Sequence, residues 1–231
     1  MRYGKEKEAR FLRRLNRFVA EVELEGQREL VHVRNTGRCR ELLLEGARVF
    51  LEEAAGEKRK TKYSLIAVEK GERLVNLDSQ APNRIAAEAL AAGRIAEIGQ
   101  VAEWKREVTY GSSRFDLYYR QGTQEGFLEV KGVTLEEQGI ARFPDAPTER
   151  GTKHLRELMA AKAAGYQAAV LFVIQMEGVA EFRPHARQDG KFALALREAA
   201  AAGVQVLAYD CKVQAEEISL DKPIPVALWQ E

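Results

Sequence analysis

The 231-residue sequence predicts two domains, an all-β barrel of the OB-fold type over residues 1–81 and a mixed α/β sheet over residues 82–231. The first prediction rests on short strand-like runs separated by glycines, which fill the N-terminal part of the chain. The second rests on a change of period after Gln80-Ala81-Pro82, where alanine-rich helical stretches begin to alternate with apolar strands.

The N-terminal domain is expected to contain short strands that alternate apolar and polar residues, as half-buried strands do. The predicted strands cover residues 18–25, 29–34, 47–53, 63–69 and 73–77. Short strands at this spacing fit an OB-fold, whose groove commonly takes nucleic acid. A small β-sandwich or an SH3-like barrel fits the same pattern.

The C-terminal domain is expected to begin with a helix over 83–98, with Asn83 as its N-cap. Strands follow at 104–110, 114–120 and 126–133, and then a proline-containing loop. The chain continues with a helix at 152–165, a strand at 168–175, a helix at 191–203 and a strand at 204–209. This order, α-β-β-β-α-β-α-β, predicts a mixed sheet with helices on its faces.

Composition is typical of a soluble globular protein, with 45% hydrophobic and 31% charged residues. No apolar run approaches the roughly 20 residues that span a bilayer, so no membrane partner is expected. The charged N-terminus lacks the apolar centre of a signal peptide, and Cys39 and Cys211 have no metal-type spacing. These features predict a cytoplasmic protein without a disulfide framework.

Charge is distributed unevenly along the chain. Residues 1–80 carry a net charge of +4 and the remainder carries −3, within an overall +1. One interpretation is ordinary variation in charge along a chain. The other is that the basic N-terminal part binds a polyanion such as nucleic acid and that the C-terminal part contains an acidic site.

The stretch SRFDLYYRQGTQEGFLEVKGVTL, residues 113–135, places acids and a lysine within predicted strands. Glu129 and Lys131 are two residues apart and therefore share a face, and a hairpin would bring Asp116 beside Glu129. Two adjacent carboxylates repel, and a divalent cation such as Mg²⁺ (or Mn²⁺) removes that penalty. The metal ligands are expected to be Asp116, Glu129 and the carbonyl of Val130, with Lys131 acting on a water or on phosphate charge. Glu88 on the first predicted helix is a further catalytic candidate. The alternative is a set of solvated strand charges in which Lys131 merely pairs with Glu129.

This layout resembles the PD-(D/E)XK nuclease-like superfamily, which has an α-β-β-β-α-β core, an Asp on its second strand and an E-x-K motif on its third. The matching residues are Asp116, Glu129 and Lys131, with Glu88 as the candidate helix acid. The resemblance implies metal-dependent hydrolysis of phosphodiester bonds.

A second resemblance covers nearly the whole chain. The stretches HVRNTGR, EVTYGSSRFD, LEVKGVTL and ARFPDAPTERGTKHLREL resemble the sugar fermentation stimulation protein family, the SfsA proteins of bacteria and archaea. The resemblance implies an OB-like domain followed by a nuclease-like domain, DNA binding without marked sequence preference, and a link to regulation of maltose or other sugar metabolism. The chain departs from the family pattern at Arg34, where a proline is common, and the arginine is expected to loosen that turn.

Basic residues in several loops are candidates for contact with nucleic acid. They are Arg13, Arg14, Arg17, His32, Asn35, Arg38, Lys58, Arg59, Lys60, Lys62, Arg150 and Lys153. The basic loop at residues 58–62 could instead be a solvated β-turn that contacts no ligand. His32 could instead have a structural role. His154 is a candidate general acid, and Thr148 or Thr152 is expected to cap the helix that carries it.

Two functions therefore remain open. One is a Mg²⁺-dependent nuclease in which the barrel grips the substrate, and the other is a DNA-binding regulator with a nuclease-like fold and no cleavage. The C-terminal segment IPVALWQE is a candidate surface for a homodimer.

Overall fold

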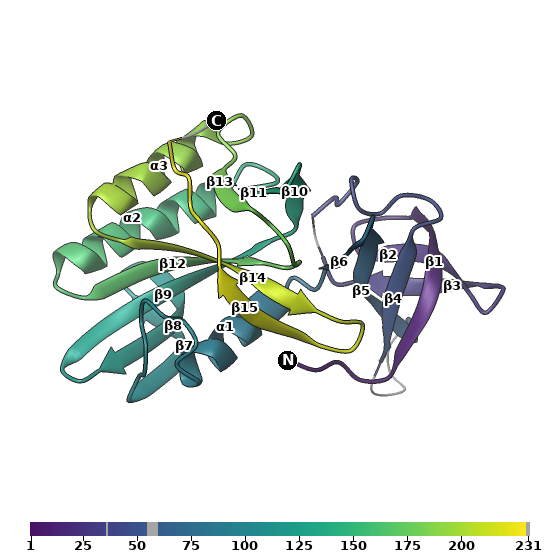
Figure 1. Cartoon of the computed structure of the whole chain (residues 1–231), viewed down its shortest axis with the longest axis horizontal. Helices are drawn as coiled ribbons and strands as arrows, with labels where there is room; N and C mark the ends of the chain where they lie inside the picture. Colours follow the sequence, from purple (N-terminus) through teal and green to yellow (C-terminus); the bar gives the residue numbers. More distant parts are fainter. Residues whose placement is uncertain (36, 55–59, 230–231) are drawn as a thin grey trace.

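The computed structural model describes residues 1–35, 37–54 and 60–229. Figure 1 shows two bodies, a small barrel formed by the N-terminal part of the chain and a larger layered domain formed by the rest. Strand β6 (Arg73–Asn76) and the turn that follows it connect the two bodies. The turn leads into helix α1 (Ala81–Ala91), which begins at the predicted domain junction.

The N-terminal domain is a closed five-stranded barrel, which confirms the predicted OB-type fold. Its strands are β1 (Glu6–Arg14), β2 (Val19–Leu24), β3 (Gln27–Val33), β4 (Arg48–Glu53) and β5 (Tyr63–Lys70). They pair in the order β3-β2-β1-β4-β5, and a parallel β3–β5 pairing closes the ring. Strand β6 (Arg73–Asn76) pairs only with β5 and lies outside the ring.

Strand β1 is absent from the sequence prediction, which counted β6 as the fifth strand of the barrel. The sequence of β1 is EKEARFLRR, and only Ala9 and Phe11 are buried. Two buried side chains among nine mostly charged residues leave little apolar alternation to recognise. The strand forms because both its edges pair, with β2 on one side and β4 on the other.

The C-terminal domain is a mixed six-stranded sheet, as predicted, with strand order β15-β14-β12-β9-β8-β7. In chain order the strands are β7 (Glu103–Tyr110), β8 (Ser113–Gln121), β9 (Gln124–Val133), β12 (Gln167–Ile174), β14 (Gln205–Val213) and β15 (Ile218–Pro223). A second, small sheet contains β10 (Leu135–Glu137), β11 (Ile140–Phe143) and β13 (Glu181–Pro184). The sequence analysis did not identify β10, β11, β13 or β15.

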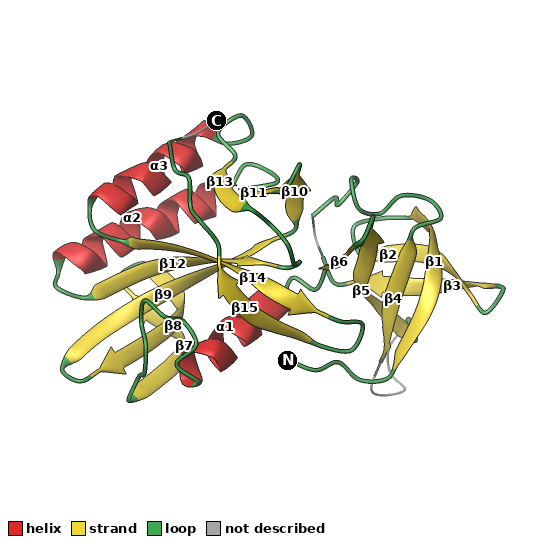
Figure 2. Cartoon of the chain, in the orientation of Figure 1, coloured by secondary structure: helices red, strands yellow, loops and turns green. Residues whose placement is uncertain are grey.

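Helices cover both faces of the large sheet (Figure 2). Helix α1 packs on one face, and α2 (Glu149–Ala163) and α3 (Gly190–Ala201) pack on the other. The alternation of β12 shows this division, because Leu171 joins the apolar cluster under α1 and Phe172 joins the cluster under α2 and α3. Helix α1 ends earlier than predicted, where Gly93 adopts a φ of +64° that favours glycine.

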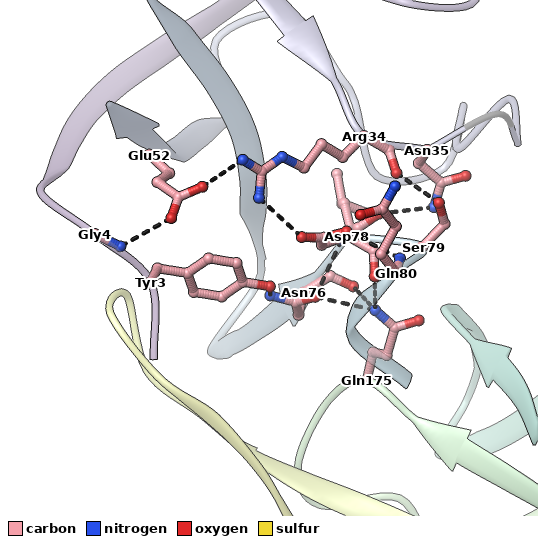
Figure 3. Close-up of polar contacts among 11 residues, drawn as sticks. Tyr3, Gly4, Arg34, Asn35, Glu52, Asn76, Asp78, Ser79, Gln80 and Gln175 are labelled. Carbon is pink, nitrogen blue, oxygen red and sulfur yellow. Dashed lines mark hydrogen bonds and ion pairs between the residues drawn. The ribbon is translucent and has the colours of Figure 1, made fainter. Parts of the chain in front are cut away.

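The two domains meet through a buried polar network built around Gln175 (Figure 3). The Gln175 amide nitrogen lies 3.1 Å from the carbonyl of Asn76, 3.0 Å from its side-chain oxygen and 3.1 Å from the carbonyl of Asp78. Asn76 in turn donates to the hydroxyl of Tyr3 at 2.8 Å. Because these groups are buried, each lost hydrogen bond would leave a polar atom without water, so the network favours one arrangement of the domains.

Arg34, the residue that departs from the family pattern, extends this network. Its guanidinium bridges Glu52 at 2.5 Å and Asp78 at 3.1 Å, and its side chain is only 23% exposed. Its carbonyl accepts from the backbone and the hydroxyl of Ser79. Arg34 therefore ties the barrel to the connector that leads into α1.

Glu136 forms a second contact between the domains. It lies on β10 and pairs with Lys70 at 2.7 Å and Arg73 at 2.9 Å, both from the β5–β6 hairpin. Burial alone would raise the pKa of Glu136, but Lys70, the backbone N–H of Gly139 and Arg73 outweigh it and lower the pKa to about 2.

Glu136→Gln is expected to remove part of the acid sensitivity of this protein. A carboxyl with a lowered pKa stabilises the fold above its unfolded value, and this stabilisation is lost as pH falls from about 4.5 through about 2. The variant should lose about 2 kcal/mol of unfolding free energy at pH 7 and little at pH 2, by urea unfolding. Glu137→Gln, with an exposed carboxylate on the same strand, is the control. An equal loss at both pH values would contradict the assignment.

Candidate active site and nucleic-acid cleft

Asp116 lies where strand β8 changes its facing pattern. Phe115 joins the apolar cluster under α2 and α3, whereas Leu117 joins the cluster under α1. The β8–β9 ladder ends at the pair Leu117–Leu128, whose chain neighbours are Asp116 and Glu129, and the charge of Glu129 acts on Asp116. In place of a further ladder bond, the backbone N–H of Val130 donates to Asp116 Oδ2 at 2.8 Å.

Glu129 is buried under α2 and has two basic neighbours. Lys131 Nζ lies 2.6 Å from Glu129 Oε1, and His154 Nδ1 contacts the same oxygen. Arg150 Nε lies 3.5 Å from His154 Nε2, on the far side of the ring from Glu129. Glu129 Oε2 is buried and has no hydrogen-bond partner among the described residues.

Burial and the charge of Glu129 raise the pKa of Asp116, against the lowering effect of the Val130 N–H and Lys131. Burial also tends to raise the pKa of Glu129, but the hydrogen bond from His154 and the charge of Lys131 outweigh it and lower that pKa. The negative charge of Asp116 is therefore poorly balanced by its surroundings. Glu129 has basic partners at Oε1 but not at Oε2.

The helix residue that reaches Asp116 is Asn83 and not Glu88. Asn83 Nδ2 donates to Asp116 Oδ1 at 2.6 Å, and the cap position predicted for Asn83 is taken by Gln80. Glu88 pairs instead with the N-terminal ammonium of Met1 at 2.8 Å and with Arg84 at 3.2 Å. Five residues along an α-helix is a rotation of about 140°, so Asn83 and Glu88 point in different directions.

Two hydrogen bonds fix the start of helix α2 beside this cluster. The Thr148 hydroxyl accepts from the backbone N–H of Gly151 at 3.0 Å, as one of the two predicted caps, and Asp189 accepts from the Thr148 N–H at 2.8 Å. These bonds set the first turn of α2, and His154 in the next turn contacts Glu129 of β9. His154 thus orients Glu129 from inside the protein, and the sequence pattern K-H-L-R-E-L alone did not indicate that contact.

A cleft of about 850 Å³ separates the barrel from the loop before α2. Its barrel side is formed by Arg17, Asn35 and residues 37–41, and its other side by residues 142–148. Its floor contains Gly132–Thr134 of β9 and the following turn, which directly follow Lys131. The cleft therefore borders the residues that follow Lys131 in β9, although Asp116, Glu129 and Lys131 are not among its lining residues.

Arg14 is placed as a support for the barrel loops, not as a free cation. Its five N–H groups all donate to backbone carbonyls, at distances between 2.6 and 3.2 Å; the acceptors belong to Asn16, Arg17, Asn35, Gly37 and Arg38. Asn35 is engaged in the same way, because its side chain donates to the carbonyl of Leu77 and accepts from the N–H of Gly37. Both residues shape the cleft wall.

Arg14→Met is expected to destabilise the protein by about 1–3 kcal/mol, because several carbonyls lose a charged donor at once. The neighbouring Arg13→Met is a matched control, since Arg13 makes one exposed pair with Glu21 and should cost less than about 1 kcal/mol. Urea unfolding of the two variants measures the difference. Equal losses would show that the Arg14 bonds do not hold the loops.

The remaining predicted contact residues are scattered. Lys58 and Arg59 lie outside the described residues, Lys60 is exposed, and Lys62 lies 5.1 Å from the ring of Tyr63. Lys153 donates to the carbonyl of Ser112 at 3.1 Å. Arg17 and Arg38 line the cleft, whereas His32 stacks on Phe18. The basic loop at 58–62 is thus not part of the cleft's described lining.

The structure bears in part on two further predictions, the homodimer surface and the absence of a membrane span. The segment proposed for a homodimer packs largely on its own chain, since Ile224 is buried and Val226 bridges to Phe182, while Trp229 is 73% exposed. The homodimer stays a prediction. Within the described residues, no helix combines the length and apolar character that crossing a bilayer requires.

No group of three or more His, Cys, Asp or Glu side chains in the described part of the chain is arranged to hold a metal ion. A metal at the cluster would therefore rest on two carboxylates, completed by backbone oxygen and water. Magnesium sites commonly use one or two carboxylates and several waters.

Comparison with known proteins identifies relatives over the whole chain. The "Sugar fermentation stimulation protein RE domain" matches residues 80–217, and the "SfsA N-terminal OB domain" matches residues 12–77. A sugar fermentation stimulation protein homologue of Desulfitobacterium hafniense (strain Y51) is 51% identical over 228 residues, covering 99% of each chain. One from Alkaliphilus oremlandii (strain OhILAs) is 52% identical over 231 residues, covering 98% of each.

A solved structure agrees with the fold. SfsA of Pyrococcus furiosus, in complex with Ca²⁺, superposes with a TM-score of 0.87 at 29% identity, covering 98% of both chains.

Proposed function

The chain belongs to the sugar fermentation stimulation protein family, and from this premise we propose that it is a nucleic-acid-binding protein with a divalent-metal site that hydrolyses phosphodiester bonds. The observation that carries the proposal is the buried, unpartnered Oε2 of Glu129 beside Asp116. A buried carboxylate oxygen without a partner is costly, and a cation between the two carboxylates would remove that cost.

The donor set suits a hard divalent cation. Asp116 and Glu129 supply carboxylate oxygens, and the Val130 carbonyl supplies a third, because the N–H and C=O of one strand residue point to the same edge and the Val130 N–H points at Asp116. The Ca²⁺ complex of the 29% identical Pyrococcus furiosus protein supports a site for such an ion in this fold. Mg²⁺ or Mn²⁺ is the proposed ion here.

The chain's own residues would divide the remaining work. The bound cation would lower the pKa of a water and offset charge on the phosphate. Lys131, at 14% side-chain exposure, lies where it can orient that water or stabilise the developing charge. His154 and Asn83 hold Glu129 and Asp116 in place, so they act as positioning residues. Arg150 and Lys153, in the first turns of α2, would contact the phosphate; they lie beside His154 and the Ser112 carbonyl.

A second candidate function is nucleic-acid binding without cleavage, in a regulator of sugar metabolism genes. The observation in its favour is that Lys131 and His154 already compensate Glu129, so the cluster folds without a cation. In that case the acids would be structural, and binding would not depend on a divalent ion.

Cleavage of labelled single- and double-stranded DNA in Mg²⁺, Mn²⁺ or EDTA tests the proposal. Wild-type protein should produce shorter products with either ion and none in EDTA. Lys131→Ala should cut at least about 100-fold more slowly, as expected for loss of a proton-transfer or charge-stabilising group. Binding that persists in EDTA with no product under any condition would favour the second candidate.

A further inference from the structure

Arg14 gathers the loops at one edge of the barrel into a single rigid corner. Through the carbonyl bonds described above it fixes the chain at Arg17 and at Arg38, which are distant in sequence. The Asn16 side chain adds two bonds, to the N–H groups of Phe18 and Val19 at 2.9 and 3.0 Å. The side chains that this corner presents are therefore preorganised, which lowers the entropic cost of binding a ligand.

Three arginines project from this corner with their charge uncompensated. Arg17, Arg38 and Arg40 are exposed, and no ion pair to any of them occurs among the described residues. All three line the interdomain cleft, and all three also line a neighbouring hollow of about 610 Å³ on the barrel. They form a ridge between the two depressions. By contrast, Arg48, an exposed arginine of the same barrel, pairs with Glu8 and Glu69. Neighbouring guanidinium groups without ion pairs can bind consecutive phosphates of a nucleic-acid strand.

An exposed aromatic side chain stands at the same corner. Phe18 directly follows Arg17, is 49% exposed, and stacks on His32 with the rings 6.4 Å apart and 11° from parallel. The Phe18 carbonyl accepts from the N–H of Val33 at 2.8 Å, which fixes the backbone that carries the ring. A large apolar ring held half in water has a face available for a flat partner, and base stacking on such a face contributes about 1–3 kcal/mol.

We propose that this corner, Arg17, Phe18, Arg38 and Arg40, binds a single-stranded segment of nucleic acid. One unpaired base stacks on Phe18, the arginines bind the neighbouring phosphates, and the strand continues into the interdomain cleft. This inference rests on the proposed function, which names nucleic acid as the ligand. It adds that the bound segment is single-stranded. Bases inside a duplex stack on one another and offer no face to Phe18, so a paired segment gains only the phosphate contacts.

The test is binding by fluorescence anisotropy in EDTA, where no cleavage interferes. The probes are a labelled oligothymidylate, an abasic strand of equal length and a duplex of equal length. Wild-type protein should bind oligothymidylate at least 10-fold more tightly than the abasic strand. Phe18→Ala should lose that preference while keeping its abasic affinity, and Phe18→Trp should restore it and show quenched tryptophan fluorescence on binding. Arg38→Ala should weaken binding of all three probes and reduce the salt dependence.

Leu44→Ala is the control, because Leu44 is 59% exposed on the same barrel but lies outside both depressions. Thermal unfolding confirms that the variants fold. Equal affinity of wild type for oligothymidylate and abasic strand, or an unchanged preference in Phe18→Ala, would overturn the proposal. Strong base-dependent binding in EDTA, together with no product in the Mg²⁺ or Mn²⁺ cleavage assay, would uphold the proposal while refuting hydrolysis. Failure to bind any probe would refute both the single-strand site and the nucleic-acid function.

Discussion

Asp116→Asn is expected to reduce the rate of metal-dependent cleavage by more than about 100-fold. This is a larger loss than removing a residue that only positions a metal ligand usually causes. The amide keeps the shape of the side chain and removes its charge. With one carboxylate gone, the site would hold a divalent cation poorly, and the water would no longer be activated.

The same change should not harm folding. Because burial and Glu129 raise the pKa of Asp116, its ionised form opposes folding in the metal-free protein above that pKa. In EDTA at pH 7.5 the variant should therefore unfold at the same or a higher temperature than wild type. Wild type should gain thermal stability on adding Mn²⁺, and the variant should gain little. Asp145→Asn, a carboxylate of the cleft wall, is the control and should keep the Mn²⁺ effect. Unchanged cleavage by Asp116→Asn would exclude Asp116 as a ligand.

Arg34→Ala is expected to have the largest effect on stability, a loss of about 3 kcal/mol. Asp78 has a side chain only 2% exposed and Glu52 is 16% exposed, so removing the guanidinium leaves buried charge without its partner. The connector between the domains would lose its tie to the barrel at the same time.

Arg48→Ala provides a matched comparison for Arg34→Ala. Arg48 also bridges two carboxylates, Glu8 and Glu69, but all three side chains are at least 35% exposed. Water and salt weaken exposed pairs, so their loss should cost far less than loss of the Arg34 pairs, and loss of the contact with Phe50 adds little. Urea unfolding of both variants measures the difference. Similar losses would show that the Arg34 pairs are as weak as surface pairs.

The sequence predicted the elements whose pattern is local. Strands such as β12, with eight consecutive mostly apolar residues, and α2, with its capping threonine and regular leucines, are recognisable without their neighbours. Strand β1 was missed because its formation depends on β2 and β4 and not on its own apolar content. The family resemblance added the order of elements around the acidic cluster.

The candidate site was predictable where residues lie two apart on one strand, as Glu129 and Lys131 do. Partners distant in sequence were not predictable from spacing. Asn83 contacts Asp116 from a helix 33 residues away, and Gln175 contacts Asn76 across 99 residues. The ion pair of Arg34 with Asp78 was not predictable for the same reason, because Asp78 lies 44 residues further along the chain.

Calorimetric titration of Mn²⁺ into the metal-free protein tests the central claim most directly, because it needs no substrate. The account predicts saturable binding to wild type at the Asp116–Glu129 pair, and loss of that binding in Asp116→Asn and in Glu129→Gln. Glu88→Gln should bind Mn²⁺ as wild type does, since Glu88 pairs with Met1 and Arg84 away from the cluster. No binding by wild type, or equal binding by wild type and Asp116→Asn, would contradict the account.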